Sequence, residues 1–375
     1  MNFELNDDQR LLADSVGRLL ADRGGFDARA AILRDGAGWN RALWRNMAEL
    51  GLLGLGFAEN DGGLGGGGVE TMIVAEALGR GLSLEPWLAT TVLAGGALRR
   101  GASAAQRAAR VPDIIAGKHI MAFAHAEPDA LRHTFDAKGT AARREGDRWT
   151  LTGTKIAVLH GADADELVVS AATDAGTSLF LVDATTAGVR CQGVIGYDGI
   201  PVATIRFDAA PAEPLGGGKS GRDVLVAVID DAIAALCAEA VGAMAETIDL
   251  TSEYLKTRQQ FGTSLGAFQA LQHRLVDMLI QVELSRSIAT HAALSIDGPS
   301  AANRTLNVSA AKVQIGRAGR MVGQNAVQLH GAIGFTSEYK VGHLFKRLTA
   351  IDALFGDADH HLARIAAAPG LPELA

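Results

Sequence analysis

The sequence has little cysteine, few aromatic residues and no excess of basic charge. Only two of its 375 residues are cysteines, and their separation suits neither a disulfide framework nor a metal site. We therefore expect Cys191 and Cys237, which both lie in apolar stretches, to be buried free thiols in a reducing compartment. The net charge is -7 and the lysines and arginines are scattered, which argues against nucleic-acid binding.

Long uncharged apolar runs are also missing. None has the length of a transmembrane helix. The first ten residues, MNFELNDDQR, are polar and acidic, where a signal peptide needs a basic start and an apolar core. We expect a cytoplasmic protein that does not insert into membranes. Its 48% hydrophobic content is enough for a large core and for more than one domain.

Hydrophobic periodicity divides the chain into three parts. Residues 1–118 show helical periodicity in several pieces. Residues 119–215 change to a period of two, in short strands rich in Val, Thr and Ile that are separated by turns without helices. This pattern predicts an antiparallel barrel or sandwich and disfavours a doubly wound sheet. Residues 216–375 return to long helices, which are typical of a four-helix bundle.

The expected helices can be located approximately from the same periodicity. In the first part they include residues 7–21, 39–53 and a helix that begins near Val69. In the last part they cover residues 224–256, 265–295, 301–329 and a pair beyond Glu338.

The most specific motif stands at the end of the first long C-terminal helix. Residues 254–262 read YLKTRQQFG, and Gln269 follows seven positions beyond Gly262. An arginine such as Arg258, at the end of a long helix, can pair bidentately with a pyrophosphate. With VELSR at 282–286 and AVQLHGAIGF at 326–335, this pattern is similar to the signature of the acyl-CoA dehydrogenase family.

The resemblance implies a fold, a cofactor and a reaction. The fold would be an N-terminal helical domain at 1–118, a central β-barrel domain at 119–215 and a C-terminal four-helix bundle at 216–375. The cofactor would be FAD, and the reaction the α,β-desaturation of an acyl-CoA thioester in the manner of fatty acid β-oxidation. An electron-transfer flavoprotein or an equivalent acceptor would take the electrons. Within the family, the pattern looks most similar to the small subunit of pimeloyl-CoA dehydrogenase, so a dicarboxylyl-CoA is a possible substrate.

Several residues would bind FAD if the resemblance holds. In the family, the residues that match Arg258, Phe261 and Gln269 reach the FAD of a neighbouring subunit, which implies at least a dimer. Gln328 and Gly331 would contact the adenosine end of the cofactor, since glycine lets the main chain approach closely.

In the barrel part, HAEP at 125–128 and KIAVLHG at 155–161 resemble two flavin-binding segments of the family. The family's isoalloxazine-contacting Thr, Trp and Thr correspond here to Ala126, Ala157 and Leu159. These three positions can therefore offer FAD only backbone contacts.

The catalytic base departs from the family pattern. Most members carry a Glu immediately before a Gly in a loop that here reads LFGD, so the Glu position is Phe355. Some relatives place the Glu on the first bundle helix, at a position that is Ala232 here. Asp357 lies two residues past the expected site, beyond a flexible glycine, and is the candidate base. It also reads as the N-cap of the last helix. The adjacent His360 and His361 point in different directions on a helix, and no metal site is expected.

Three functions are compatible with these residues. The chain could be an active, homo-oligomeric acyl-CoA dehydrogenase that uses Asp357. It could be the half-site subunit of a hetero-oligomer whose second dehydrogenase subunit supplies the Glu. It could also be a flavin-dependent oxidase on the same scaffold.

Overall fold

The computed structural model describes residues 4–128, 133–218 and 220–368. These residues form two compact units. The first takes residues within 1–29, 68–83 and 233–375, and the second takes residues within 30–67 and 84–232. The predicted domain boundaries at 118 and 215 stay a prediction.

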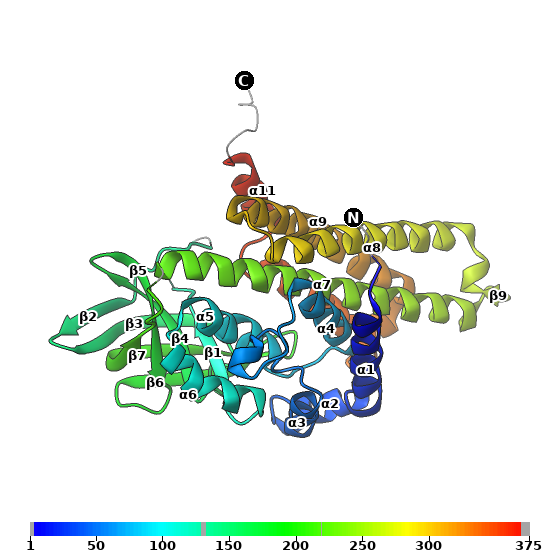
Figure 1. Cartoon of the computed structure of the whole chain (residues 1–375). Helices are drawn as coiled ribbons and strands as arrows, with labels where there is room; N and C mark the ends of the chain where they lie inside the picture. The colour runs from blue at the N-terminus through cyan, green and yellow to red at the C-terminus, as the bar shows by residue number, and fades with distance from the viewer. Residues whose placement is uncertain (1–3, 129–132, 219, 369–375) are drawn as a thin grey trace. The chain divides into compact units, whose positions relative to one another are not determined.

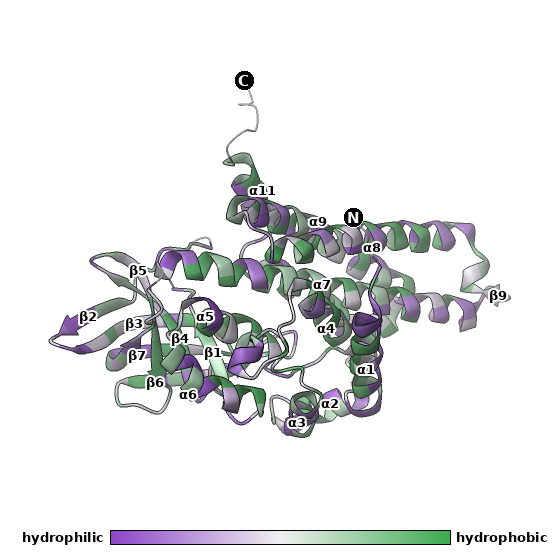
Figure 2. Cartoon of the chain, viewed as in Figure 1, coloured by the Kyte–Doolittle hydropathy of each residue, from purple (hydrophilic) through white to green (hydrophobic). Residues whose placement is uncertain are grey.

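The first unit is helical and centres on α9 (Ala301–His330), which packs against its neighbours α8, α10 and α11 (Figure 1). The other helices of this unit are α1 (Asp7–Arg23), α4 (Gly68–Gly81), α8 (Gln269–Ile296), α10 (Lys340–Ala353) and α11 (Ala358–Ala366). Helix α7 (Gly221–Thr257) begins in the second unit and ends in the first, and the short strands β8 (Gln259–Gln260) and β9 (Thr263–Ser264) follow it. Along α8 and α9, hydrophilic and hydrophobic residues alternate (Figure 2).

Small residues explain why α10 can lie close to α9. A Cβ atom added at Gly323 would lie 2.3 Å from Cδ2 of Phe345, and one added at Gly316 would lie 2.1 Å from Oδ1 of Asp352. A side chain at Gly323 would collide with the ring of Phe345, and one at Gly316 would displace the carboxylate of Asp352.

The second unit contains a closed β-barrel. Strands β4, β2, β3, β7 and β5 form a ring in that order, because β5 pairs with both β7 and β4. Strand β1 adds to β4 in parallel, and β6 adds to β7. The bounds are β1 Met121–Ala124, β2 Ala141–Glu145, β3 Arg148–Leu159, β4 Glu166–Thr173, β5 Gly176–Asp183, β6 Val189–Ile195 and β7 Pro201–Pro214.

Alternating side chains fill the barrel, as the period of two predicts. Leu151, Phe180, Ile205 and Phe207 are among its fully buried residues. The predicted barrel is thus confirmed. The helices of this unit are α3 (Arg41–Glu49), η1 (Glu59–Asp61), the π-helix η2 (Leu88–Ala94), α5 (Gly95–Gly101) and α6 (Ala104–Ile115). Helix α2 (Phe26–Asp35) crosses from the first unit into the second.

Two sequence expectations need correction. The helix expected at 39–53 ends at Glu49, because Gly51 adopts a φ of 80° and begins a run of turns. Cys191 is exposed rather than buried, since it lies on β6, which pairs only with β7; Cys237 is buried, and both thiols are free. Among the described helices, none is long and apolar enough to cross a membrane.

Candidate functional site

The family motif forms one compact segment at the end of α7. The chain turns back through a two-stranded hairpin, and the amide N–H of Leu265 donates to the carbonyl of Arg258 at 2.9 Å. At the tip, Phe261 has a φ of 56° and is 88% exposed. Its ring meets only the edge of Phe268, with centroids 6.1 Å apart. Gln269 opens α8 and is also exposed.

The guanidinium of Arg258 is exposed, and no ion pair involves it within the described residues. An exposed arginine beside an almost fully exposed phenylalanine is suited to bind an anionic ligand that carries a flat ring. The segment therefore fits the phosphate and aromatic groups of FAD.

The end of α9 joins this segment through an aromatic cluster. The ring of His330 is buried and stacks on Tyr254, one turn before Arg258, with centroids 4.5 Å apart. The ring of His330 also contacts that of Tyr339, with centroids 5.1 Å apart. Burial lowers the pKa of His330, so the ring is neutral at pH 7, and its Nδ1–H donates to the carbonyl of Ala326 at 2.8 Å.

Gln328 and Gly331, at the same end of α9, are exposed. The predicted residues Arg258, Phe261, Gln269, Gln328 and Gly331 thus lie in the same unit. Gly331 has a φ of 63°, a conformation that favours glycine.

The barrel brings together the two segments that resemble flavin-binding segments of the family. The amide N–H of Ile156 donates to the carbonyl of Ala126 at 2.9 Å. A bulge between Lys155 and Val158 leaves Ala157 exposed with a φ of 50°, and Ala126 is exposed as well. Leu159 is only 8% exposed. An alanine side chain carries no hydrogen-bonding group, so Ala126 and Ala157 can offer only backbone N–H and C=O groups to a ligand; their contact with FAD stays a prediction.

A buried ion pair supports these two segments from inside the barrel. Nζ of Lys155, which is 0% exposed, donates to Oε1 of Glu127 at 2.8 Å, to the carbonyl of His125 at 3.0 Å and to Oγ of Ser170 at 3.0 Å. Burial lowers the pKa of Lys155 to about 8. The carboxylate of Glu127 also accepts backbone N–H groups of Lys138 at 2.9 Å, Gly139 at 2.7 Å and Thr140 at 2.9 Å.

The charged pair was not predicted as a functional element, although its two residues lie in the matched segments. The available signal was a lysine inside the predicted strand region and a glutamate that follows the apolar run MAFA at 121–124. Burial opposes ionisation of Glu127, but the hydrogen bonds from Lys155 and from the amides of Gly139 and Lys138 prevail and hold its pKa at about 2. The ion pair of Lys155 and Glu127 therefore holds together the two backbone segments that contain Ala126 and Ala157.

His125 completes this network as a neutral imidazole. Burial and the charge of Lys155 lower its pKa to about 4. Because a carbonyl can only accept, Nε2–H donates to the carbonyl of Thr134 at 2.6 Å. The Nδ1 atom therefore accepts from the hydroxyl of Ser170, at 2.8 Å.

The loop between α10 and α11 contains the position at which the sequence resemblance predicts the family's carboxylate. Phe355 occupies it, with a φ of 58°. Oδ1 of Asp357 accepts the amide N–H of His360 at 2.9 Å, so Asp357 caps α11. That hydrogen bond is the main cause of a lowered pKa for Asp357, which makes its carboxylate a weaker base.

The alternative position on α7 holds no carboxylate either. Ala232 is fully buried. Its neighbour Asp231 forms ion pairs with Arg100 at 2.7 Å and Arg99 at 3.2 Å.

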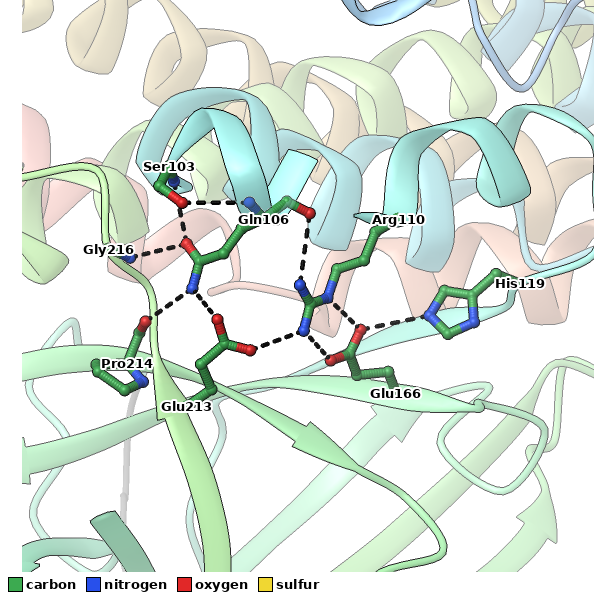
Figure 3. A network of polar contacts seen from close by, with 8 residues as sticks. All are labelled: Ser103, Gln106, Arg110, His119, Glu166, Glu213, Pro214 and Gly216. Atoms are coloured by element: carbon green, nitrogen blue, oxygen red, sulfur yellow. Dashed lines mark hydrogen bonds and ion pairs between the residues drawn. The ribbon is translucent and has the colours of Figure 1, made fainter. Parts of the chain in front are cut away.

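A further polar network joins α6 to the barrel (Figure 3). Arg110 donates bidentately to Glu166, at 2.8 Å for both contacts, and reaches Glu213 at 2.9 Å. Nε2 of His119 lies 3.3 Å from Glu166, and this contact is the main cause of a raised pKa for His119. Gln106 donates to Glu213 at 2.6 Å. The network anchors the helix to strands β4 and β7.

Comparison with known proteins agrees with this geometry. Models of the acyl-CoA dehydrogenase N-terminal, middle and C-terminal domains match residues 6–118, 122–210 and 219–369. Acyl-CoA dehydrogenase FadE27 of Mycobacterium tuberculosis is 30% identical over 340 residues, which cover 87% of each chain. The chain belongs to the acyl-CoA dehydrogenase family. It is therefore an oxidoreductase of a flavoprotein family whose cofactor is FAD.

Two solved structures are similar over almost the whole chain. The ChsE4-ChsE5 complex from Mycobacterium tuberculosis has a TM-score of 0.90 at 27% identity, covering 97% of this chain and 98% of that one. PigA with FAD and proline has a TM-score of 0.89 at 25% identity, covering 98% of both chains. The finer similarity to the small subunit of pimeloyl-CoA dehydrogenase stays a prediction.

Proposed function

We propose that this chain is one subunit of a two-chain, FAD-dependent acyl-CoA dehydrogenase whose other chain supplies the catalytic carboxylate. The reaction would be the α,β-desaturation of an acyl-CoA thioester, with an electron-transfer flavoprotein or an equivalent protein as acceptor. The observation that carries the proposal is the loop between α10 and α11, where Phe355 stands at the carboxylate position and Asp357 caps a helix.

The chemistry explains why this loop decides the role of the chain. A carboxylate must remove the α-proton of the thioester, while FAD supplies the hydride acceptor. The phenyl ring of Phe355 cannot accept a proton. The carboxylate of Asp357 already accepts an amide N–H, and its lowered pKa reduces its basicity.

The FAD-binding role is proposed residue by residue. Arg258 would pair with the pyrophosphate, and Phe261 and Gln269 would contact the same cofactor from the hairpin and the start of α8. Gln328 and Gly331 would contact the adenosine end. Ala126, Ala157 and Leu159 would contribute only backbone, which supports weak flavin binding by the chain alone.

An exposed apolar face on α8 supports assembly with another subunit. Its side chains stand at helical spacing and are about half exposed: Val276 52%, Leu279 45%, Ile280 50% and Leu284 53%. In unit 1, Phe261 at 88% and Phe335 at 80% are more exposed still. Contiguous apolar surface of this kind marks protein interfaces. The ChsE4-ChsE5 structure is a complex of two differently named proteins, which favours a hetero-oligomer as the assembly.

One observation favours a second candidate, an active homo-oligomeric dehydrogenase. Asp357 is exposed and stands only two residues from the carboxylate position. Release of its cap contact with His360 would free the carboxylate to act as the base.

Visible spectra of the purified chain, with FAD in excess, test both candidates. Acyl-CoAs including pimeloyl-CoA are added anaerobically to wild type, Phe355→Glu, Phe355→Gln and Asp357→Asn. We expect bleaching of the flavin only in Phe355→Glu, because that change restores a carboxylate. The Gln variant controls for polarity without basicity.

The outcomes separate the candidates. Bleaching of wild type that Asp357→Asn abolishes would overturn the two-chain proposal and establish Asp357 as the base. A Phe355→Glu chain that binds FAD and acyl-CoA yet stays oxidised would show that residue 355 is not the base position.

A further inference from the structure

A fully buried lysine holds the loop that carries Phe355. Lys312 lies on α9 and is 0% exposed. Its Nζ donates to three backbone carbonyls: Ile351 at 2.7 Å, Asp352 at 2.9 Å and Gly356 at 2.8 Å. The first two belong to the last turn of α10, and the third belongs to the loop.

The three contacts need a charged lysine. Each carbonyl requires an N–H donor, and only the ammonium form has three. The carbonyls in the last turn of a helix lack intrahelical partners and lie at the negative end of its dipole. Lys312 therefore caps the C-terminus of α10 and binds the following loop with the same group.

A second contact holds the loop at Phe355, and it comes from His361 on α11. His361 is fully buried, and its Nε2–H donates to the carbonyl of Phe355 at 3.1 Å. Burial lowers the pKa of His361 to about 3, so its Nδ1 accepts from Ser309 on α9, at 3.2 Å. The carbonyls of Phe355 and Gly356 are thus both tied to α9.

The loop backbone itself is constrained. Phe355 and Gly356 have φ values of 58° and 99°, a region that side chains other than glycine rarely adopt. A Cβ atom at Gly356 would lie 2.4 Å from Cδ2 of His360. Such a conformation persists only where surrounding contacts determine it.

We propose that Lys312 is a positioning residue, which fixes the backbone of residues 354–357 so that the side chain at 355, and not Asp357, is presented for the reaction. The assignment of position 355 rests on the proposed function, whereas the fixing of the loop does not. A loop held in this way explains why a carboxylate two residues along does not replace the missing one.

Hydrogen exchange tests the fixing of the loop without FAD or substrate. The amides of Leu354, His360 and His361 report on it, since all three are hydrogen-bonded at the loop. Lys312→Met keeps the length of the side chain and removes the charge. We expect these amides to exchange about 10-fold faster or more in Lys312→Met, because hydrogen bonds from a charged donor are lost.

Arg320→Met is the matched control. Arg320 is also a cation of α9 near the same helix end, but it pairs with the side chain of Asp352 at 3.1 Å and is largely exposed. Its replacement should leave the three amides unchanged. Equal exchange in folded Lys312→Met and Arg320→Met would overturn the proposal.

If Lys312→Met does not fold, hydrogen exchange of the wild-type chain at several pH values tests the proposal instead. Burial lowers the pKa of Lys312 to about 8, so the third N–H is lost as pH rises from 7 to 9.5. The carboxylates of Asp352 and Asp357 and the thiol of Cys237 also face Lys312. Cys237, whose pKa is raised to about 12, does not titrate in this range, and neither do Asp357, whose pKa is lowered, or the neutral His361. As pH rises, the hydrogen-exchange rates of the loop amides should increase by a larger factor than those of amides inside α8. An equal increase in both sets of amides would contradict the proposal.

Kinetics in the Phe355→Glu background test the link to the reaction. Adding Lys312→Met should slow flavin bleaching by about 10-fold or more, while the affinities for FAD and acyl-CoA stay unchanged. Arg320→Met should leave both the bleaching rate and these affinities unchanged. An unchanged bleaching rate would overturn the positioning role. Failure of Phe355→Glu to bleach at all would overturn the proposed function and leave the exchange result standing.

Discussion

Replacement of Glu127 by glutamine should destabilise the barrel by about 3–5 kcal/mol, the usual cost of breaking a buried ion pair by removing one partner. The side chain of Lys155 is 0% exposed and that of Glu127 is 8% exposed. Glutamine replaces the two carboxylate oxygens, of which Oε2 accepts the N–H groups of Lys138 and Gly139 and Oε1 accepts that of Thr140, by one oxygen and one NH2 group. It also leaves the ammonium of Lys155 buried without a counter-charge. The variant therefore removes the charge together with one of the two acceptor oxygens.

The pKa of Glu127 gives an independent magnitude. Its value falls from 4.5 to about 2, since the hydrogen bonds from Lys155 and the loop amides outweigh burial. At about 1.4 kcal/mol for each pKa unit, the ionised carboxylate contributes about 3 kcal/mol. A carboxylate with a depressed pKa stabilises the fold above its unfolded pKa. This stability should be fully present above about pH 4.5 and should be lost as pH falls towards 2.

Urea unfolding of wild type, Glu127→Gln, Lys155→Met and the double variant measures this contribution at pH 7. The double variant lacks both charges, so its loss should be smaller than the sum of the single losses by about 2–3 kcal/mol. Additive losses, or a cost below about 1 kcal/mol for Glu127→Gln, would refute the pair as the support of the flavin-binding segments.

Three further outcomes are expected. The contact with Glu166 is the main cause of the raised pKa of His119, so the charge of His119 stabilises the fold fully below its unfolded pKa, and this stabilisation is lost as pH rises through the folded pKa. His119→Gln should therefore lower the melting temperature more at pH 6 than at pH 9. Equal losses at the two pH values would count against the ion pair. Leu284→Glu, in the apolar face of α8, should dissociate the oligomer in sedimentation velocity, whereas Leu11→Glu, at a position 62% exposed on α1, should not. Arg258→Gln should weaken FAD binding by about 10- to 100-fold in a fluorescence titration, because charged hydrogen bonds to phosphate are lost; an unchanged affinity would remove Arg258 from the cofactor site.

Much of the fold could be predicted because its signals are local. The period of two between residues 119 and 215 predicted a barrel or sandwich, and the family resemblance favoured the barrel. The helical periodicity placed α7, α8 and α9 within a few residues of their observed bounds. One of the two failures was local and the other was tertiary. The glycine at position 51 ends α3 earlier than the apolar pattern indicates, and strand order, not composition, decides that Cys191 lies on an exposed strand.

The candidate site also has residues that could be predicted from local sequence and residues that could not. The motif around Arg258 is contiguous, so its residues could be predicted to lie together from the sequence alone. The supports of the site could not be predicted. Lys155 pairs with a glutamate 28 residues away, and Lys312 binds carbonyls 39 to 44 residues away.

By itself, the sequence determined the order of secondary-structure elements, the family motif and the absence of a carboxylate at position 355. Only the tertiary structure decided that Asp357 is engaged as a helix cap and that Lys312 holds the loop before it. The physical reason is that a residue type and its spacing predict local backbone structure. The partner of a buried polar group, by contrast, depends on which distant segments pack against it.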